Sequence, residues 1–179
     1  PSNMFHDSTG RGRLGTALSR IWSPHTNPIE FGGSATERPV SLDMYITDPI
    51  TRERRLKLCK EHYDRFVTEL WWTVRLCIES RQLKNLPEDV MEEMAMREWD
   101  KVKENKYKLE TKKEMKLRVG RSPDLGDWLT IAVEGARRRG FQINKLGNQD
   151  EGSSVDWSWL EAMKEKANRV RQAHELHRV

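Results

Sequence analysis

The stretch Gly120-Arg-Ser-Pro-Asp-Leu-Gly-Asp127 predicts the start of a helix. Ser122 is a favourable N-cap residue, and Pro123 suits the first helical position. Asp124 and Asp127 are three residues apart, so a helix would place both carboxylates on one side. An apolar run follows and would anchor this helix in a core. Carboxylates on a rigid element at the edge of a core suit a divalent metal ion, although an acidic first turn also simply complements the helix dipole.

The composition favours one folded domain with peripheral segments. Of the 179 residues, 36% are hydrophobic and 34% are charged, and the formal net charge is +4. A mildly basic chain weakly favours a polyanionic partner such as nucleic acid. The sequence contains neither a secretory signal nor an apolar run of membrane-spanning length, so we expect an intracellular protein without a membrane partner. Because the chain does not begin with Met, we expect it to belong to a longer protein.

The first thirty residues predict a βαβ unit. Residues 3–7 suit a strand, 14–22 a helix and 28–31 a second strand. The intervening Gly10-Arg-Gly-Arg-Leu-Gly15 matches the dinucleotide-binding pattern, and Glu30 follows at a suitable spacing. The first strand is polar, however, and no second set of alternating strands follows, which disfavours a nucleotide site.

Asp7 offers a different interpretation of the same unit. It ends the predicted strand, at the edge where sites of α/β proteins usually form. The simpler alternative is that Asp7 and Ser8 only make an Asx-type turn.

The rest of the chain predicts mostly helices. A loop is expected over 32–50, a long helix over 51–82 with Trp71 and Trp72 in its core-facing stripe, and a second helix from Leu86 whose inner face includes Trp99. Further elements are expected as a strand over 106–110, a helical turn over 112–117 and a helix over 122–139. Cys59 and Cys77 would both lie on the long helix, too far apart to pair.

The domain organisation is predicted from composition and spacing. Residues 1–146 would form the main domain, and the polar, glycine-containing stretch 147–154 a linker. Residues 155–179 would form an appended amphipathic helix with a seam for another helix or a partner. His174 and His177 on this helix show no convincing zinc-ligand spacing.

Asp7, Asp124 and Asp127 together suggest a site for Mg²⁺ or Mn²⁺. Hard cations prefer oxygen ligands, and two such ions can stabilise both the attacking and the leaving oxygen of a phosphodiester. Lys112 is placed to reach a phosphate, and Arg11 and Arg13 are candidates for contacts with a DNA backbone.

Five segments, spread over residues 3–143, resemble the C-terminal nuclease domain of phage terminase large subunits. In order along the chain they are Asp7-Ser-Thr-Gly-Arg-Gly12, Phe31-Gly-Gly33, Phe66-Val-Thr-Glu-Leu-Trp-Trp-Thr-Val-Arg75, Tyr107-Lys-Leu-Glu-Thr-Lys-Lys-Glu-Met-Lys116 and Gly120-Arg-Ser-Pro-Asp-Leu-Gly-Asp127. The Ser-Pro-Asp-x-x-Asp element is the most specific of them.

The resemblance implies an α/β, helix-rich, partial ribonuclease-H-like nuclease fold that cuts concatemeric double-stranded DNA with two metal ions. By position, Asp7 matches the family's second acid, Asp124 its last acid, Asp127 an auxiliary carboxylate and Lys112 a basic position. The family's partners are the viral portal and the small terminase subunit, its ATPase domain lies upstream, and it acts in the host cytoplasm during viral assembly.

The chain departs from the family pattern at two points. The family's first acid would lie on a strand before this chain, so we expect the chain alone to be weakly active or inactive. Trp128 stands where the family usually has Ala, and it would either crowd the site or fill a local gap. No Walker A motif is present. A non-catalytic module that docks to DNA or to the portal remains the alternative function, with nucleotide binding at Gly10–Gly15 a third.

Overall fold

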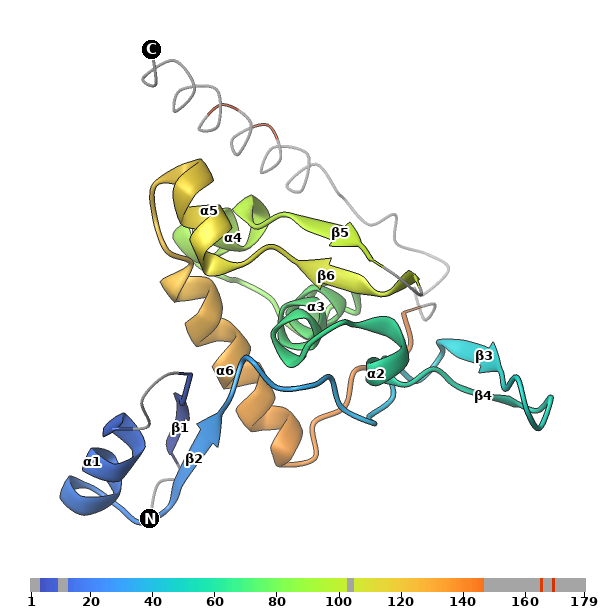
Figure 1. The fold of residues 1–179 in the computed structure, drawn as a ribbon, viewed down its shortest axis with the longest axis horizontal. Coiled ribbons are helices and arrows are strands. Elements are labelled where there is room, and N and C mark those ends of the chain that lie inside the picture. Colours follow the sequence, from blue (N-terminus) through green and yellow to red (C-terminus); the bar gives the residue numbers. More distant parts are fainter. Residues whose placement is uncertain (1–3, 10–12, 103–104, 147–164, 166–168, 170–179) are drawn as a thin grey trace.

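The structure is a computed structural model that describes residues 4–9, 13–102, 105–146, 165 and 169. It is a mixed α/β arrangement of helices and short strands, as predicted (Figure 1). The strands are β1 (Met4–Asp7), β2 (Thr26–Ile29), β3 (Tyr45–Thr47), β4 (Arg54–Leu56), β5 (Trp99–Lys101) and β6 (Tyr107–Leu109). The helices are α1 (Arg13–Ile21), α2 (Cys59–His62), α3 (Phe66–Glu79), α4 (Glu88–Met96), α5 (Lys112–Val119) and α6 (Asp124–Arg138).

The predicted βαβ unit is confirmed. β1 and β2 pair in parallel, with Met4 opposite Thr26 and Asp7 opposite Ile29, and α1 connects them. The unit lies beside α6, where Phe5 packs so closely that a Cβ on Gly135 would be 2.9 Å from its ring. The pairing leaves Asp7 at the carboxyl end of β1, as the sequence predicted.

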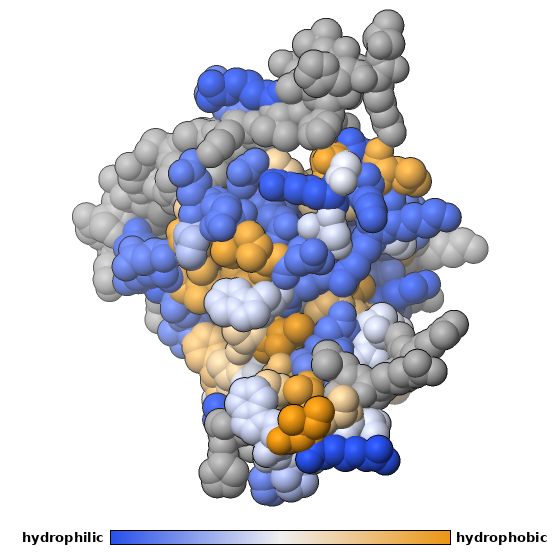
Figure 2. All heavy atoms as spheres, turned by 90° about the vertical axis from the view of Figure 1, so that its left-hand side faces the viewer, coloured by the Kyte–Doolittle hydropathy of each residue, from blue (hydrophilic) through white to orange (hydrophobic). Residues whose placement is uncertain are grey.

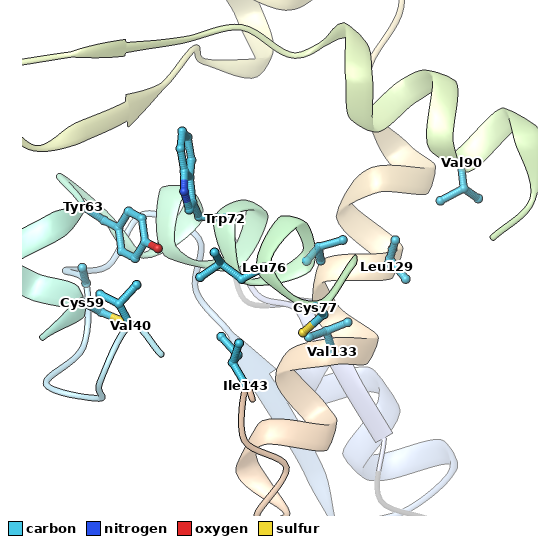
Figure 3. Packing of buried hydrophobic residues seen from close by; sticks show 12 residues of the cluster. Val40, Cys59, Tyr63, Trp72, Leu76, Cys77, Val90, Leu129, Val133 and Ile143 are labelled. Carbon is cyan, nitrogen blue, oxygen red and sulfur yellow. The ribbon is translucent and has the colours of Figure 1, made fainter. Parts of the chain in front are cut away.

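Helices α3 and α6 pack against each other in the middle of the molecule (Figures 1 and 3). Buried residues of both helices, including Val74, Cys77, Leu129 and Val133, join one hydrophobic cluster. Trp72 belongs to this cluster and Trp71 is also buried, so the predicted core role of both tryptophans is confirmed. This packing fixes the position of the first turn of α6.

The long helix expected over 51–82 is wrong, whereas the loop expected over 32–50 holds except for the short strand β3 near its end. The chain instead forms an antiparallel hairpin, β3–β4, followed by two separate helices, α2 and α3. Asp48 stabilises the turn because its carboxylate accepts hydrogen bonds from the backbone of Ile50 and Thr51 and pairs with Arg55 at 2.7 Å. Cys59 and Cys77 therefore lie on different helices, and both are buried free thiols.

A second hairpin, β5–β6, packs over α3. Strand β6, helix α5 and the start of α4 confirm the predictions for those segments within a few residues. Trp99 is not on the inner face of a helix, because α4 ends at Met96 and Trp99 opens β5 with 48% of its surface exposed. Its ring meets those of Trp72 and Tyr107 at centroid distances of 5.1 Å.

Within the described residues the strands form three separate two-stranded sheets. No described helix is long and apolar enough to cross a membrane. The predicted linker 147–154 lies outside the described residues, as does the predicted helix 155–179 apart from Glu165 and Arg169. Those two residues are exposed and helical, and their side chains form an ion pair at 3.9 Å.

Candidate functional site

Three residues singled out from the sequence lie together: Asp7, Lys112 and Asp127. Lys112 Nζ is 2.5 Å from Asp127 Oδ2 and 3.9 Å from Asp7 Oδ2. They come from the carboxyl end of β1, the first residue of α5 and the first turn of α6. Residues far apart in the sequence thus form one charged cluster at the edge of the core.

Asp7 has its two carboxylate oxygens in different environments. Oδ1 accepts a hydrogen bond from the backbone N–H of Thr9 at 2.6 Å, which is the Asx-type turn considered from the sequence. Thr9 in turn accepts the N–H of Phe31 through its hydroxyl at 3.2 Å, tying this turn to the end of β2. Oδ2 faces Lys112, so Asp7 both shapes the turn and contributes charge to the cluster.

Lys112 is positioned by a well-capped helix. Thr111 and Glu114 form a capping box at the start of α5, in which each side chain accepts a hydrogen bond from the other residue's backbone. The ammonium group also lies 5.4 Å from the ring centre of Phe31. Lys112 keeps 42% of its side-chain surface exposed, so the cluster opens to solvent on this side.

Asp127 is the buried member of the cluster, with 5% of its surface exposed. Its Oδ1 accepts a hydrogen bond from Trp71 Nε1 at 3.3 Å and lies 3.5 Å from Arg97 Nη1. Burial raises the pKa of Asp127 above its ordinary value, although Lys112, Arg97 and Trp71 all favour the ionised form. Burial likewise lowers the pKa of Arg97, with Asp127 opposing that change.

Two expectations about the start of α6 are wrong. The helix begins at Asp124 with Pro123 in the N-cap position, and Ser122 makes no side-chain cap. Asp124 and Asp127 do not share an environment, because Asp124 is exposed while Asp127 is buried. Successive helical residues are about 100° apart, so positions i and i+3 differ by about 60°, enough here to separate a core position from a solvent position.

The remaining candidate residues fall elsewhere. Arg11 lies outside the described residues, and Arg13 is the first residue of α1. Trp128 is 61% exposed, so it fills no gap in the core. It belongs to α6. Figure 2 shows the face of the molecule that carries α1, α5 and α6, where apolar and charged groups are mixed.

Sequence reasoning missed Arg97, Glu93 and the polar role of Trp71. Glu93 is buried on α4, and its carboxylate accepts a hydrogen bond from the backbone N–H of Gly126 at 2.7 Å. Trp71 was interpreted only as a core residue, and its spacing carries no sign that the indole N–H meets a carboxylate. Glu93 and Arg97 lie in a charged stretch of sequence that is typical of an exposed surface. Their burial follows only from how the helices pack.

A second group of charges, also missed from the sequence, joins α3, α6 and the loop before β3. Glu69 is completely buried, and its carboxylate lies 3.1 Å from Arg38 and 3.3 Å from Arg137. Arg38 also pairs with Glu134 at 3.0 Å. Arg38 and Glu134 line an open hollow beside the βαβ unit, but their charges are already paired with each other.

The Asp7–Lys112–Asp127 cluster fits a metal ion in part. Carboxylate oxygens are the ligands that Mg²⁺ and Mn²⁺ prefer, and Asp127 Oδ2 accepts no hydrogen bond within the described part of the chain beyond its ion pair with Lys112. The described residues contain no group of three or more His, Cys, Asp or Glu side chains arranged to hold a metal. The cluster therefore offers two protein carboxylates. Comparisons of this chain with protein-family models, curated proteins and solved structures find no match.

Proposed function

We propose that this chain is a metal-dependent endonuclease domain of a viral DNA-packaging terminase, with a ribonuclease-H-like fold, cutting concatemeric double-stranded DNA. The observation that carries the proposal is the convergence of Asp7 and Asp127 on Lys112 Nζ, at 3.9 and 2.5 Å. The parallel β1–β2 pair and its crossover helix are consistent with this fold class. The resemblance at the Ser-Pro-Asp-x-x-Asp element supports the same function.

In this proposal Asp7 and Asp127 hold Mg²⁺ or Mn²⁺. Two such ions, when bound, supply an activated water and stabilise the charge that develops on the phosphodiester. We assign the principal role on α6 to Asp127 rather than to Asp124. Asp127 is buried and forms an ion pair with Lys112, whereas Asp124 is exposed. The resemblance expects a further acid on a preceding strand, which would complete the ligand set.

Lys112 has a separate task. Its ammonium balances two carboxylates at a solvent-open position, and it is placed to pair with a phosphate oxygen when DNA occupies the site. Arg11 and Arg13 stay candidates for contacts with the DNA backbone in this proposal. In the packaging machinery the domain would work with an ATPase region, the portal and the small terminase subunit in the host cytoplasm.

The proposal is tested by titrating the chain with Mn²⁺ and following free Mn²⁺ by electron paramagnetic resonance. We expect binding that Asp7→Asn and Asp127→Asn each weaken at least tenfold, since each removes an anionic ligand. Asp100→Asn is the control, because Asp100 is an exposed aspartate on β5 whose carboxylate accepts the backbone N–H of Lys101. Asp124→Asn separates the two assignments on α6, and a loss equal to that of Asp127→Asn would return the role to Asp124.

The cleavage reaction is tested with plasmid DNA, using the longer protein with an upstream ATPase region that the resemblance implies. Cutting should require Mg²⁺ or Mn²⁺ and should be lost in Asp127→Asn but not in Asp100→Asn. Unchanged cutting in Asp7→Asn and Asp127→Asn would rule out the proposed site. Robust Mn²⁺-dependent cutting by the chain alone would contradict the expected need for a further acid.

One observation favours a non-catalytic docking module for DNA or portal. Asp127 already has Lys112 and Arg97 as cationic partners, so the cluster is charge-compensated without any metal ion. A docking module would leave Mn²⁺ unbound while the wild type and Asp127→Asn retain equal affinity for DNA or portal. The same titration therefore distinguishes the two functions.

A further inference from the structure

We propose that Trp71 and Arg97 are positioning residues that bind Oδ1 of Asp127 and thereby present its Oδ2 to Asp7 and Lys112. This inference rests on the proposed metal-dependent function, and it assigns a role to two residues outside the acidic cluster. Neither residue is expected to touch metal or DNA. Their effect on a reaction would pass through Asp127.

The Trp71 contact depends on the absence of a side chain at position 126. A Cβ on Gly126 would lie 2.5 Å from Trp71 Cη2 and 2.8 Å from Cζ2. Real Cβ atoms essentially never approach a ring so closely. Glycine thus lets the indole lie against the first turn of α6, where its N–H reaches Asp127 Oδ1 at 3.3 Å. The contact between Trp71 and Asp127 is therefore part of the close packing between α3 and α6.

Arg97 approaches the same oxygen from the end of α4. Its Nε and Nη2 donate to the backbone carbonyl of Glu110 at 3.2 and 3.0 Å, which fixes the planar guanidinium. The guanidinium carbon lies 4.6 Å from the ring centre of Trp71. Nη1 is buried without a hydrogen bond in the described chain, and it points at Asp127 Oδ1 from 3.5 Å. Trp71 and Arg97 therefore both meet the same oxygen, Oδ1 of Asp127.

The backbone beneath Asp127 is held as well. Glu93 accepts the N–H of Gly126 at 2.7 Å, so α4 fixes the turn that carries Asp127. With Oδ1 bound and the backbone fixed, the buried Oδ2 is the oxygen that faces Lys112 Nζ, at 2.5 Å. Partners of this kind, one shell beyond the ligands, typically change metal affinity 10–100-fold when they are mutated.

The test compares two identical changes on one helix. Trp71→Phe removes the indole N–H that meets Asp127. Trp72→Phe makes the same change in a ring that packs against Trp99 and Tyr107 instead. In the Mn²⁺ titration we expect about tenfold weaker binding for Trp71→Phe and less than twofold change for Trp72→Phe. In an Asp127→Asn background the effect of Trp71→Phe should disappear, because positioning acts only through that carboxylate.

A second readout does not involve a metal ion. In variants that keep Trp71, the chemical shift of its indole ¹H–¹⁵N resonance should change in Asp127→Asn and stay the same in Asp100→Asn. Arg97→Lys, which keeps the charge but loses the fork, should weaken Mn²⁺ binding as Trp71→Phe does. This variant also serves if Trp71→Phe does not fold.

The outcomes separate this inference from the function on which it rests. If the wild type binds Mn²⁺ through Asp127 while Trp71→Phe and Arg97→Lys bind it equally well, the positioning role is wrong and the metal site stands. If the wild type binds no Mn²⁺, both are overturned. If the chemical shift of the Trp71 indole resonance is unchanged in Asp127→Asn, the contact between Trp71 and Asp127 is wrong.

Discussion

The indole ring of Trp71 lies against Gly126, so close that a Cβ atom at position 126 would come within 2.5 Å of the ring. This relationship joins α3 to the first turn of α6 and brings Asp127 to the indole N–H. It also explains why a glycine occurs within a helix, where it is otherwise unfavourable. The two residues make the candidate site a consequence of core packing.

Gly126→Ala should therefore destabilise the fold. Alanine gains up to about 1 kcal/mol in helix propensity, but the clash with a buried ring costs about 1–3 kcal/mol, and more if the helices separate. We expect a net loss of about 1–2 kcal/mol in urea unfolding. Gly32→Ala is the control, because a Cβ there meets nothing within 4 Å. Equal stability of Gly126→Ala and the wild type would show that the ring moves aside freely.

The buried charge pair Glu69–Arg137 should respond strongly to the loss of one partner. Glu69 has no exposed surface, and the side chain of Arg137 is only 6% exposed. Glu69→Gln leaves the guanidinium without its carboxylate, which typically costs about 3–5 kcal/mol. Removing the exposed pair of Lys60 with Glu37 by Lys60→Met should change the stability far less, because solvent screens an exposed ion pair.

The coupling within that pair is measured by a double-mutant cycle. The double variant Glu69→Gln, Arg137→Met should lose less free energy of unfolding than the sum of its single variants, since no uncompensated charge remains. Strict additivity would mean that the two residues do not interact energetically.

His62 should make the stability depend on pH. It is 8% exposed, and burial, reinforced by Lys57 and Lys101, lowers its pKa from 6.5 to about 4. Between these values the unfolded chain binds the proton and the folded chain does not, so the free energy of unfolding rises from pH 4 to 6.5 and falls on acidification. The contribution of His62 is about 3 kcal/mol at most.

This prediction is checked by urea unfolding at a series of pH values. His62→Phe should have a shallower dependence between pH 4 and 6.5 than the wild type, and His25→Gln, at an exposed histidine, controls for the loss of a histidine elsewhere. A dependence that is equally steep in His62→Phe would assign it to other groups.

The two cysteines should be unreactive in the folded protein. Burial raises the pKa of the Cys59 thiol to about 12 and that of Cys77 to about 11, and the thiolate is the nucleophilic form. We expect Ellman's reagent to modify neither thiol on the timescale of minutes in native buffer at pH 8. Both should react at once in denaturant. Rapid reaction of either thiol without denaturant would show that its part of the core opens readily.

Local sequence patterns predicted the elements whose signals are short-range. Glycine and proline bound the βαβ unit, which was found, and a helical turn over 112–117 was expected where α5 forms; its Thr111–Glu114 capping box is a short-range signal of the same kind. The hairpin β3–β4 was missed because its strands are three residues long and its turn depends on Asp48 pairing with Arg55. The apolar spacing over 51–82 was continuous enough to suggest one helix, although the chain breaks it before Phe66.

The candidate site divides in the same way. The sequence identified Asp7, Lys112 and Asp127 by residue type, by their places at element ends and by a family resemblance, and the structure brings these three together. The family resemblance ranked Asp124 above Asp127, as the last acid against an auxiliary carboxylate, because neither motif nor spacing says which of two helical positions faces the core. Trp71 and Arg97 carried no signal, since their partner is distant in the sequence.

What this sequence determined by itself is therefore its chemistry and its local geometry: which carboxylates and cations are present, and at which strand or helix ends they stand. The tertiary structure alone decided that Asp127 rather than Asp124 is buried, and that Trp71 and Arg97 meet it. The physical reason is that capping and turn preferences act over a few residues, whereas burial and ion pairing depend on how α3, α4 and α6 pack.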